Sequence, residues 1–253
     1  MKKFLSSLSI FLFLSVSVFS ISKYALPEIV PNSVVLSHNY YVIDYNPNYL
    51  NPFWCAEELT YDMTQGTATR PGKFRPDPLF PGSFKDSEYT NSGYDRGHQV
   101  PAADMKFSQD AMNETFYTTN ICPQYPAMNQ QDWQYIEDLV RKWTQEYHCL
   151  YVVTGPVFEK GITPATIGKT LQIAVPQAYF KVILVYYQDD PVKSQAIGFI
   201  VRNEKPVKGT PLQSYAVDVK EIEEQTGLKF FAAIPDPYKD EIIKTLELSK
   251  WKW

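Results

Sequence analysis

The spacing of apolar and polar residues predicts a chain that mixes strands with helices. Residues 34–45 are rich in Val, Tyr and Ile, as is typical of a strand. Further strands are predicted at 150–154, 171–175, 179–187 and 196–201, where short apolar runs are bounded by Gly, Pro or Asp. Because strands and helices do not alternate strictly, the order of elements predicts an α+β fold.

Residues 130–148 show a helical period. Apolar side chains recur there at three- and four-residue steps: Trp133, Ile136, Val140, Trp143 and Tyr147. Asn129 or Asp132 is expected to cap the start of this helix. Shorter helices are predicted within 106–118 and over 219–225, the second ending at Gly227. Residues 71–87 are dense in Pro, Gly and Asp and predict a long loop.

Composition narrows the class of protein. A chain of 253 residues with 44% hydrophobic and 21% charged residues is globular rather than disordered or fibrous. No linker interrupts it, so we expect residues 23–253 to form a single domain. The net charge of −4 counts mildly against a nucleic-acid partner. It does not exclude one, because basic residues such as Arg70, Lys73 and Arg75 can line a local groove.

The first 22 residues resemble an export signal. Lys2 and Lys3 precede an uncharged, apolar and serine-rich run, and the small residues Ser20 and Ser22 flank a plausible cleavage point. The alternative is an uncleaved N-terminal anchor, but no stop-transfer pattern follows the run. We therefore expect residues 1–22 to be removed and the protein to be secreted or periplasmic.

The three cysteines, Cys55, Cys122 and Cys149, leave two alternatives open. Export would allow one disulfide within the chain and would leave one thiol over. Buried free thiols are as consistent with the sequence. No pair of cysteines has the spacing of zinc ligands.

Residues 95–98, Asp-Arg-Gly-His, place an acid, a cation and a histidine within four positions. Hydrolysis of a phosphodiester needs a base that is active near neutral pH, and histidine supplies one. It also needs positive charge on the phosphoryl oxygens, which Arg96 can supply. Gly97 allows a close backbone approach or a sharp turn. A single histidine in a loop is more often structural, so the motif alone is moderate evidence.

A second segment carries candidate metal-site residues. Asn129 stands at the start of the predicted long helix, and an amide oxygen is a hard ligand suited to Mg²⁺. Glu137 follows eight residues later, about 12 Å along a helix axis. It could reach an ion at Asn129 only by bending back or through a bound water. The alternative is that Asn129 is a helix cap and Glu137 a solvated acid.

Together the motifs resemble the DNA/RNA non-specific endonuclease family, the ββα-metal nucleases. The resemblance rests on four segments in order: Arg70 with Phe-Arg-Pro-Asp at 74–77, Asp-Arg-Gly-His at 95–98 with Pro-Ala-Ala-Asp-Met at 101–105, Thr-Asn-Ile at 119–121 with Pro-Gln at 123–124, and Asn129, Trp133 and Glu137. Weaker similarity extends it over about residues 38–235. The resemblance implies a central antiparallel sheet flanked by helices.

The resemblance also implies roles for single residues. His98 would be the general base, and Asn129 would be the only direct protein ligand of one Mg²⁺ or Mn²⁺ ion. Glu137 would hold metal-bound water. Arg70 and Arg96 would steady the scissile phosphate, with Arg75 as a competitor for the role of Arg70. Asn120 would support the site by hydrogen bonding.

The implied activity is endonucleolytic hydrolysis of DNA and RNA through phosphate contacts, with 5′-phosphate products. Two alternatives use the same residues. One is a nucleic-acid-binding module that lacks catalysis, and the other is a phosphodiesterase that acts on small nucleotide esters.

Overall fold

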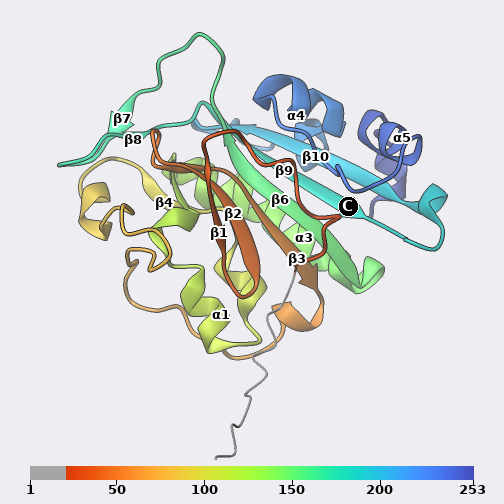
Figure 1. Cartoon of the computed structure of the whole chain (residues 1–253), viewed down its shortest axis with the longest axis horizontal. Helices are drawn as coiled ribbons and strands as arrows, with labels where there is room; N and C mark the ends of the chain where they lie inside the picture. The colour runs from red at the N-terminus through yellow and green to blue at the C-terminus, as the bar shows by residue number, and fades with distance from the viewer. Residues whose placement is uncertain (1–20) are drawn as a thin grey trace, which may run out of the picture.

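The fold is organised around one antiparallel sheet, seen in a computed structural model that describes residues 21–253 (Figure 1). The strand order is β1-β2-β3-β6-β9-β10-β11, and every neighbouring pair is antiparallel. The strands are β1 (Val34–Ser37), β2 (Tyr41–Asn46), β3 (Asn51–Thr60), β6 (Cys149–Val157), β9 (Ala178–Val185), β10 (Gln195–Arg202) and β11 (Ala216–Val217). The predicted α+β class with a central antiparallel sheet is confirmed.

A smaller hairpin and a long helix form the ββα unit. Strands β4 (Asp95–His98) and β5 (Ile121–Gln124) pair antiparallel, with His98 opposite Ile121. Helix α1 (Gln109–Glu114) lies between them in sequence, and the chain after β5 enters a continuous helical segment. That segment consists of α2 (Pro126–Met128), a π-helical turn (Asn129–Trp133) and α3 (Gln134–Tyr147).

Alternating side chains give the central sheet two apolar faces. On β9, Tyr179 and Ile183 belong to the cluster packed by α3, whereas Phe180 and Val182 face the opposite cluster. Helices α4 (Val219–Thr226) and α5 (Tyr238–Lys244) cover that opposite face (Figure 1). Strand β9 is therefore buried on both sides. The chain also forms an arm in which β7 (Thr166–Ile167) pairs with β8 (Ile173–Ala174).

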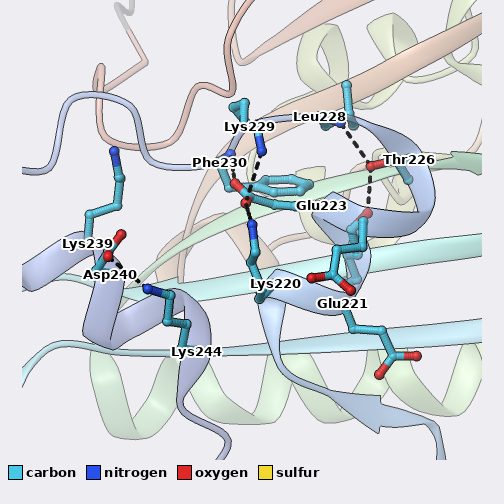
Figure 2. Close-up of polar contacts among 12 residues, drawn as sticks. Lys220, Glu221, Glu223, Thr226, Leu228, Lys229, Phe230, Lys239, Asp240 and Lys244 are labelled. Carbon is cyan, nitrogen blue, oxygen red and sulfur yellow. Dashed lines mark hydrogen bonds and ion pairs between the residues drawn. The ribbon is translucent and has the colours of Figure 1, made fainter.

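Helix α4 follows local capping rules closely. The Asp218 side chain accepts from the Glu221 amide at the start of the helix, and Gly227 ends it with φ of 81°. The nearly buried Glu223 carboxylate lies between Lys220 and Lys229, 3.3 and 3.5 Å away (Figure 2). The predicted helix and its stop at Gly227 are confirmed.

Several other predictions hold with shifted bounds. The short helix within 106–118 is α1, and the predicted loop at 71–87 contains no helix or strand before a 3₁₀ turn at Asp86–Tyr89. The strand predicted at 171–175 shrinks to Ile173–Ala174. The strand predicted at 34–45 is wrong as one element. The chain turns between β1 and β2, and His38 leaves the strand to hydrogen-bond Asp77.

The predicted start of the long helix is also wrong. Helical backbone begins at Pro126, so Asn129 lies inside the segment with φ of −58° and ψ of −44°. Neither Asn129 nor Asp132 caps it, because a proline at the first helical position already starts it. A π turn over Asn129–Trp133 replaces the uniform period that the sequence suggested.

Several elements were not predicted from the sequence, among them β3, the β4–β5 hairpin and α5. Strand β3 carries Pro52, Glu57 and Glu58, so its pattern is not that of an ordinary buried strand.

Cys55, Cys122 and Cys149 are all free thiols, which decides between the two alternatives for the cysteines. Across residues 21–253, no helix has both the length and the apolar character needed to cross a membrane.

Candidate active site

The β4 strand, the loop that precedes it and the α3 helix enclose a polar cleft of about 420 Å³. Its lining is Arg70, Phe74, Arg96, His98, Pro101, Ala102, Ala103, Asn129, Gln130, Gln134, Glu137, Asp138 and Arg141. Five of the six residues predicted for the site are in this set. They come from segments up to 67 positions apart in the chain, from Arg70 to Glu137, so only folding brings them together.

His98 lies at the end of β4 between two aromatic rings. Its ring centroid is 5.3 Å from that of Phe74 and 4.8 Å from that of Phe116. Burial, and then the charge of Arg70, lower the pKa of His98 to about 3. Its Nε2 atom has no hydrogen-bond partner within the described residues. At neutral pH the imidazole is therefore neutral, with a nitrogen that can accept a proton.

Arg96 lies two residues before His98 and so shares its face of the strand. Its Nε pairs with the Asp86 carboxylate, and its Nη2 donates to the Asp86 carbonyl at 2.9 Å. The guanidinium also lies over the rings of Tyr89 and Phe74, at 5.5 and 5.9 Å from their centroids. These contacts hold a cation at the cleft wall in one orientation.

The structure separates Arg70 from its competitor Arg75. Arg70 lines the cleft and its charge acts on His98. The Arg75 guanidinium lies 4.8 Å from the centre of the Tyr117 ring and donates to the Asn113 carbonyl at 3.3 Å, and it does not line the cleft. Of the two arginines, Arg70 is thus the one that lines the cleft.

Asn129 is held by a carboxylate from the neighbouring strand. Its Nδ2 donates to Asp95 Oδ2 at 2.9 Å, and Gln130 Nε2 donates to the same oxygen at 2.7 Å. An ionised carboxylate only accepts, so the amide group that faces Asp95 must be the nitrogen. The Asn129 oxygen is left for another partner. Asp95 therefore orients Asn129, a role that we did not assign to it from the sequence.

The π turn explains how Glu137 faces the same cleft as Asn129. In a regular α-helix, eight residues make about 2.2 turns, which leaves the two side chains about 80° apart. A π turn takes up one extra residue. Seven α-helical steps then remain, close to two full turns, and both side chains line the cleft. π turns are frequent at functional sites.

Glu137 sits in an unusual electrostatic setting. Burial raises its pKa to about 7, although the nearby cations Lys181 and Arg141 pull it down. It is half-buried at the cleft wall rather than solvated on an outer helix face. The alternative of a merely solvated helix acid is therefore wrong.

Asn120 does not line the cleft. It is fully buried, and its side chain bonds the Val100 amide at 2.9 Å and the Val100 and Thr115 carbonyls at 3.0 and 2.9 Å. It thereby fixes the chain two residues after His98.

Glycine is required at position 97 because the Gln124 side chain packs closely against the backbone there, and not because the chain turns. A Cβ at this position would lie 2.1 Å from that side chain.

Arg141 was missed in the sequence although a signal for it existed. It lies four residues after Glu137, a spacing that places two helical side chains on one face. Its Nη1 donates to Asp104 Oδ1 at 2.6 Å, and it lines the cleft. Asp104 belongs to the segment that follows His98, so this ion pair ties the two halves of the site together.

The chemistry of the donors fits a hard divalent ion. Asn129 and Glu137 line the same cleft as His98, and the Asn129 nitrogen is already bonded to Asp95. Within residues 21–253, no three or more His, Cys, Asp or Glu side chains gather in a way that could hold a metal. An amide oxygen supplemented by water and phosphate is a coordination that Mg²⁺ accepts.

Comparison with known proteins shows the family. The family model described as DNA/RNA non-specific endonuclease matches residues 24–237. The chain is 37% identical over 227 residues to nuclease 1, mitochondrial, of Schizosaccharomyces pombe, which covers 84% of this chain and 70% of the relative. It is 31% identical to human endonuclease G, mitochondrial, over 83% of this chain and 72% of that protein. A solved structure of an EndoG/EndoGI complex aligns with a TM-score of 0.77 at 30% identity, covering 85% of this chain and 91% of that one.

The relatives correct our expectation about location. The fission yeast and human proteins, and the mitochondrial nuclease of Saccharomyces cerevisiae at 32% identity, are mitochondrial rather than exported. The prediction of a secreted or periplasmic protein is therefore wrong. Positive charge ahead of a serine-rich, acid-free run is shared by organelle transit peptides and export signals, so the pattern did not separate them. Residues 1–20 of the expected signal lie outside the described residues.

The sheet, the ββα unit, the polar cleft and these similarities agree with one another. The chain belongs to the DNA/RNA non-specific endonuclease family, and it is a hydrolase of phosphodiester bonds with the ββα-metal nuclease fold.

Proposed function

We propose that this nuclease cuts both DNA and RNA within the chain, with little sequence preference, and leaves 5′-phosphates. The observation that carries the proposal is the gathering of His98, Arg70, Arg96, Asn129 and Glu137 in one cleft. Arg70 and Arg96 are suited to phosphate oxygens, and Asn129 and Glu137 are suited to an ion and its water. Such contacts position a nucleic acid without reading its sequence. We also propose that residues 23–253 act as a single nuclease domain.

His98 is the general base of the proposed mechanism. Its neutral imidazole takes a proton from water as that water attacks phosphorus in line with the leaving 3′ oxygen. Arg70 and Arg96 face the same cleft and stabilise negative charge on the phosphoryl oxygens. The bonds from Asp86 to Arg96 keep that cation oriented before substrate arrives.

Asn129 and Glu137 would hold one Mg²⁺ or Mn²⁺ ion. Asn129 would provide the direct ligand through the oxygen that Asp95 leaves available, and Glu137 would hold water of the ion's hydration shell. When bound, such an ion stabilises charge on the leaving oxygen. Asn120 acts only through the backbone beside His98 and is a positioning residue.

The test uses the purified chain on supercoiled plasmid and on structured RNA, with Mg²⁺ and with chelator. We expect cleavage of both substrates, abolished by chelator, and 5′-phosphates at the new ends. Binding without cleavage would support the non-catalytic module instead. Hydrolysis restricted to small phosphate diesters would support the phosphodiesterase.

Two substitutions sharpen the assignment of the ion. Asn129→Ala removes the direct ligand, whereas Glu137→Ala removes a contact made through water, which usually costs about 10–100-fold. We expect Asn129→Ala to be the more damaging, measured as plasmid cleavage rate against Mg²⁺ concentration. Equal activity of Asn129→Ala and the unsubstituted chain would contradict the single-ligand assignment.

A further inference from the structure

The lysines on two sides of the molecule differ in their partners. Four lysines of α4, α5 and the loop between these helices each have a carboxylate oxygen within 3.5 Å: Lys220, Lys229, Lys239 and Lys244 (Figure 2). Lys85 and Lys169 are exposed, and they form no ion pair with any residue of 21–253. The positive charge of these two side chains is therefore available to a partner from outside the chain.

Glu88 brings these two lysines, which we call the outer lysines, to one place. Its carboxylate is nearly buried and accepts from the Lys169 amide at 2.5 Å and from the Thr170 hydroxyl at 2.6 Å. The Glu88 amide donates in turn to the Lys85 carbonyl at 3.0 Å. The backbones of both outer lysines are thus bonded to the same residue, although the two lie 84 positions apart in the chain.

The tip of the β7–β8 arm, which carries Lys169, is fixed from beneath. Ile167 and Ile173 of the arm pack in an apolar cluster with Tyr89. Gly168 has φ of 123°, and a Cβ there would lie 2.2 Å from a backbone carbonyl oxygen across the turn, so the turn is tight. Packing and hydrogen bonds therefore hold the backbone of Lys169 in place, and only its side chain is free to meet a ligand.

The 3₁₀ turn at Asp86–Tyr89 connects the outer lysines to the cleft. The Asp86 carbonyl accepts from Arg96 Nη2 at 2.9 Å, and the Tyr89 ring centre lies 5.5 Å from the Arg96 guanidinium. Glu88 belongs to the same turn and binds the backbones of both lysines. The outer lysines thus lie just beyond Arg96. In Figure 1, β4 and the β7–β8 arm are on the left of the view, whereas α5 is on the right.

We propose that Lys85 and Lys169 form a second phosphate-binding site outside the cleft, which holds the backbone of a polynucleotide a few nucleotides from the bond that is cut. A strand carries a phosphate at every nucleotide, so one phosphate can lie at Arg96 while another meets the outer lysines. A small phosphate diester cannot reach both places. The site would therefore make the enzyme prefer long substrates, whatever their sequence. The inference rests on the proposed nuclease function.

The experiment measures binding of a labelled DNA duplex by fluorescence anisotropy over a series of KCl concentrations. Every chain in this series carries His98→Ala, which removes the proposed base and so prevents cleavage during the measurement. We compare Lys85→Ala, Lys169→Ala and the double variant with Lys169→Arg, which keeps the charge. Lys244→Ala is the matched control, because it removes an exposed lysine that is already paired with Asp240 at 2.8 Å (Figure 2).

The salt dependence of the affinity counts the phosphate contacts. The slope of log K against log [KCl] changes by about 0.9 for each phosphate contact on a duplex. We therefore expect Lys85→Ala and Lys169→Ala each to lower the slope by about 0.9, and the double variant by about 1.8. Lys169→Arg and Lys244→Ala should keep the slope. A lysine that only supported the fold would lower the urea unfolding midpoint and leave the slope unchanged.

A second measurement uses chains in which His98 is intact. Lys169→Ala should raise KM for plasmid DNA several-fold and leave kcat unchanged, because the contact is the same before and during the reaction. An unchanged salt slope in Lys169→Ala would overturn the inference, as would an equal loss of slope in Lys244→Ala or a fall in kcat at constant KM. An unsubstituted chain that neither binds nor cuts DNA or RNA would instead overturn the proposed nuclease function.

Discussion

The two faces of the central sheet are built by different rules. On the face covered by α4 and α5, the apolar cluster includes Phe180, Phe230 and Ile222, and, among the described residues, the buried acids beside it carry no buried lysine or arginine with them. On the face covered by α3, charged groups are buried among aromatic side chains, and the helix itself contains a π turn. Both faces bury large side chains, so the difference is not one of packing alone.

On the face under α4 and α5, helix α4 begins and ends where its local sequence predicts. This helix has an aspartate cap and a glycine stop, and the buried acids of the face have partners. Glu223 is paired with two lysines and accepts from the Phe230 amide, and Asp44, which lies opposite Trp54, accepts from the Val30 amide at 2.8 Å. The face under α3 differs, because it buries the side chains of Lys181 and Glu57 almost completely. Departures of this kind concentrate where function needs a geometry that stability alone would not select. The comparison predicts that changes on the two faces separate activity from stability.

The largest expected effect is on catalysis. His98→Ala should lower the rate of DNA cleavage by about 10²- to 10⁴-fold, the scale of a lost general base. Its urea unfolding midpoint should stay near that of the unsubstituted chain, because Nε2 makes no hydrogen bond within the described residues. His38→Ala is the control: it breaks a 3.0 Å bond to Asp77 away from the cleft and should spare activity per folded molecule. Equal losses of activity from both substitutions would show that His98 is structural.

The opposite face should show the reverse behaviour. Phe230 is 1% exposed and meets Phe180 edge-on, with ring centroids 5.7 Å apart. Phe230→Ala should cost about 3–5 kcal/mol of unfolding free energy, from lost burial and an unfilled cavity. Chemical denaturation measures the cost, and cleavage assays at low temperature should give normal activity per folded molecule. A loss of activity beyond the unfolded fraction would mean that the two faces are coupled.

The smallest expected effect concerns a polar clamp around Glu88, in the 3₁₀ turn whose Asp86 pairs with Arg96. Glu88 accepts from the amides of Lys169, Thr170 and Leu171 and from the Thr170 hydroxyl at 2.6 Å. These bonds lower the pKa of Glu88 to about 2. Glu88→Gln should cost about 1–3 kcal/mol near neutral pH, because an amide nitrogen replaces an acceptor.

The pH dependence of this effect has a definite sign. A carboxyl whose folded pKa is depressed stabilises the fold above its unfolded pKa, about 4.3, and loses that contribution as the pH falls toward 2. The stability difference between the unsubstituted chain and Glu88→Gln should therefore shrink between about pH 4 and pH 2. Urea midpoints at pH 7, 4 and 2.5 measure it, and a constant difference would contradict the clamp.

Much of the site could be predicted from the sequence, because the types of its residues and their order along the chain already indicate the chemistry. Asp95, Arg96, Gly97 and His98 are adjacent in one motif, and Asn129 and Glu137 stand in the helical segment that the apolar period marked. The helix α4 was predicted almost to its ends, since its caps are local signals. Location was predicted wrongly, since export and transit segments share a composition.

What the sequence by itself determined is therefore the kind of chemistry, the α+β class and the elements whose signals lie within a few residues of each other. Only the tertiary structure decided which arginine enters the cleft, which way the Asn129 amide points and how eight residues of helix return Glu137 to the same side. It also buried Lys181 in a strand that reads as ordinary core, where its ammonium donates to the Thr154 hydroxyl. Periodicity records which side chains are buried, whereas the partners of a buried charge come from distant segments and are chosen only when the chain packs.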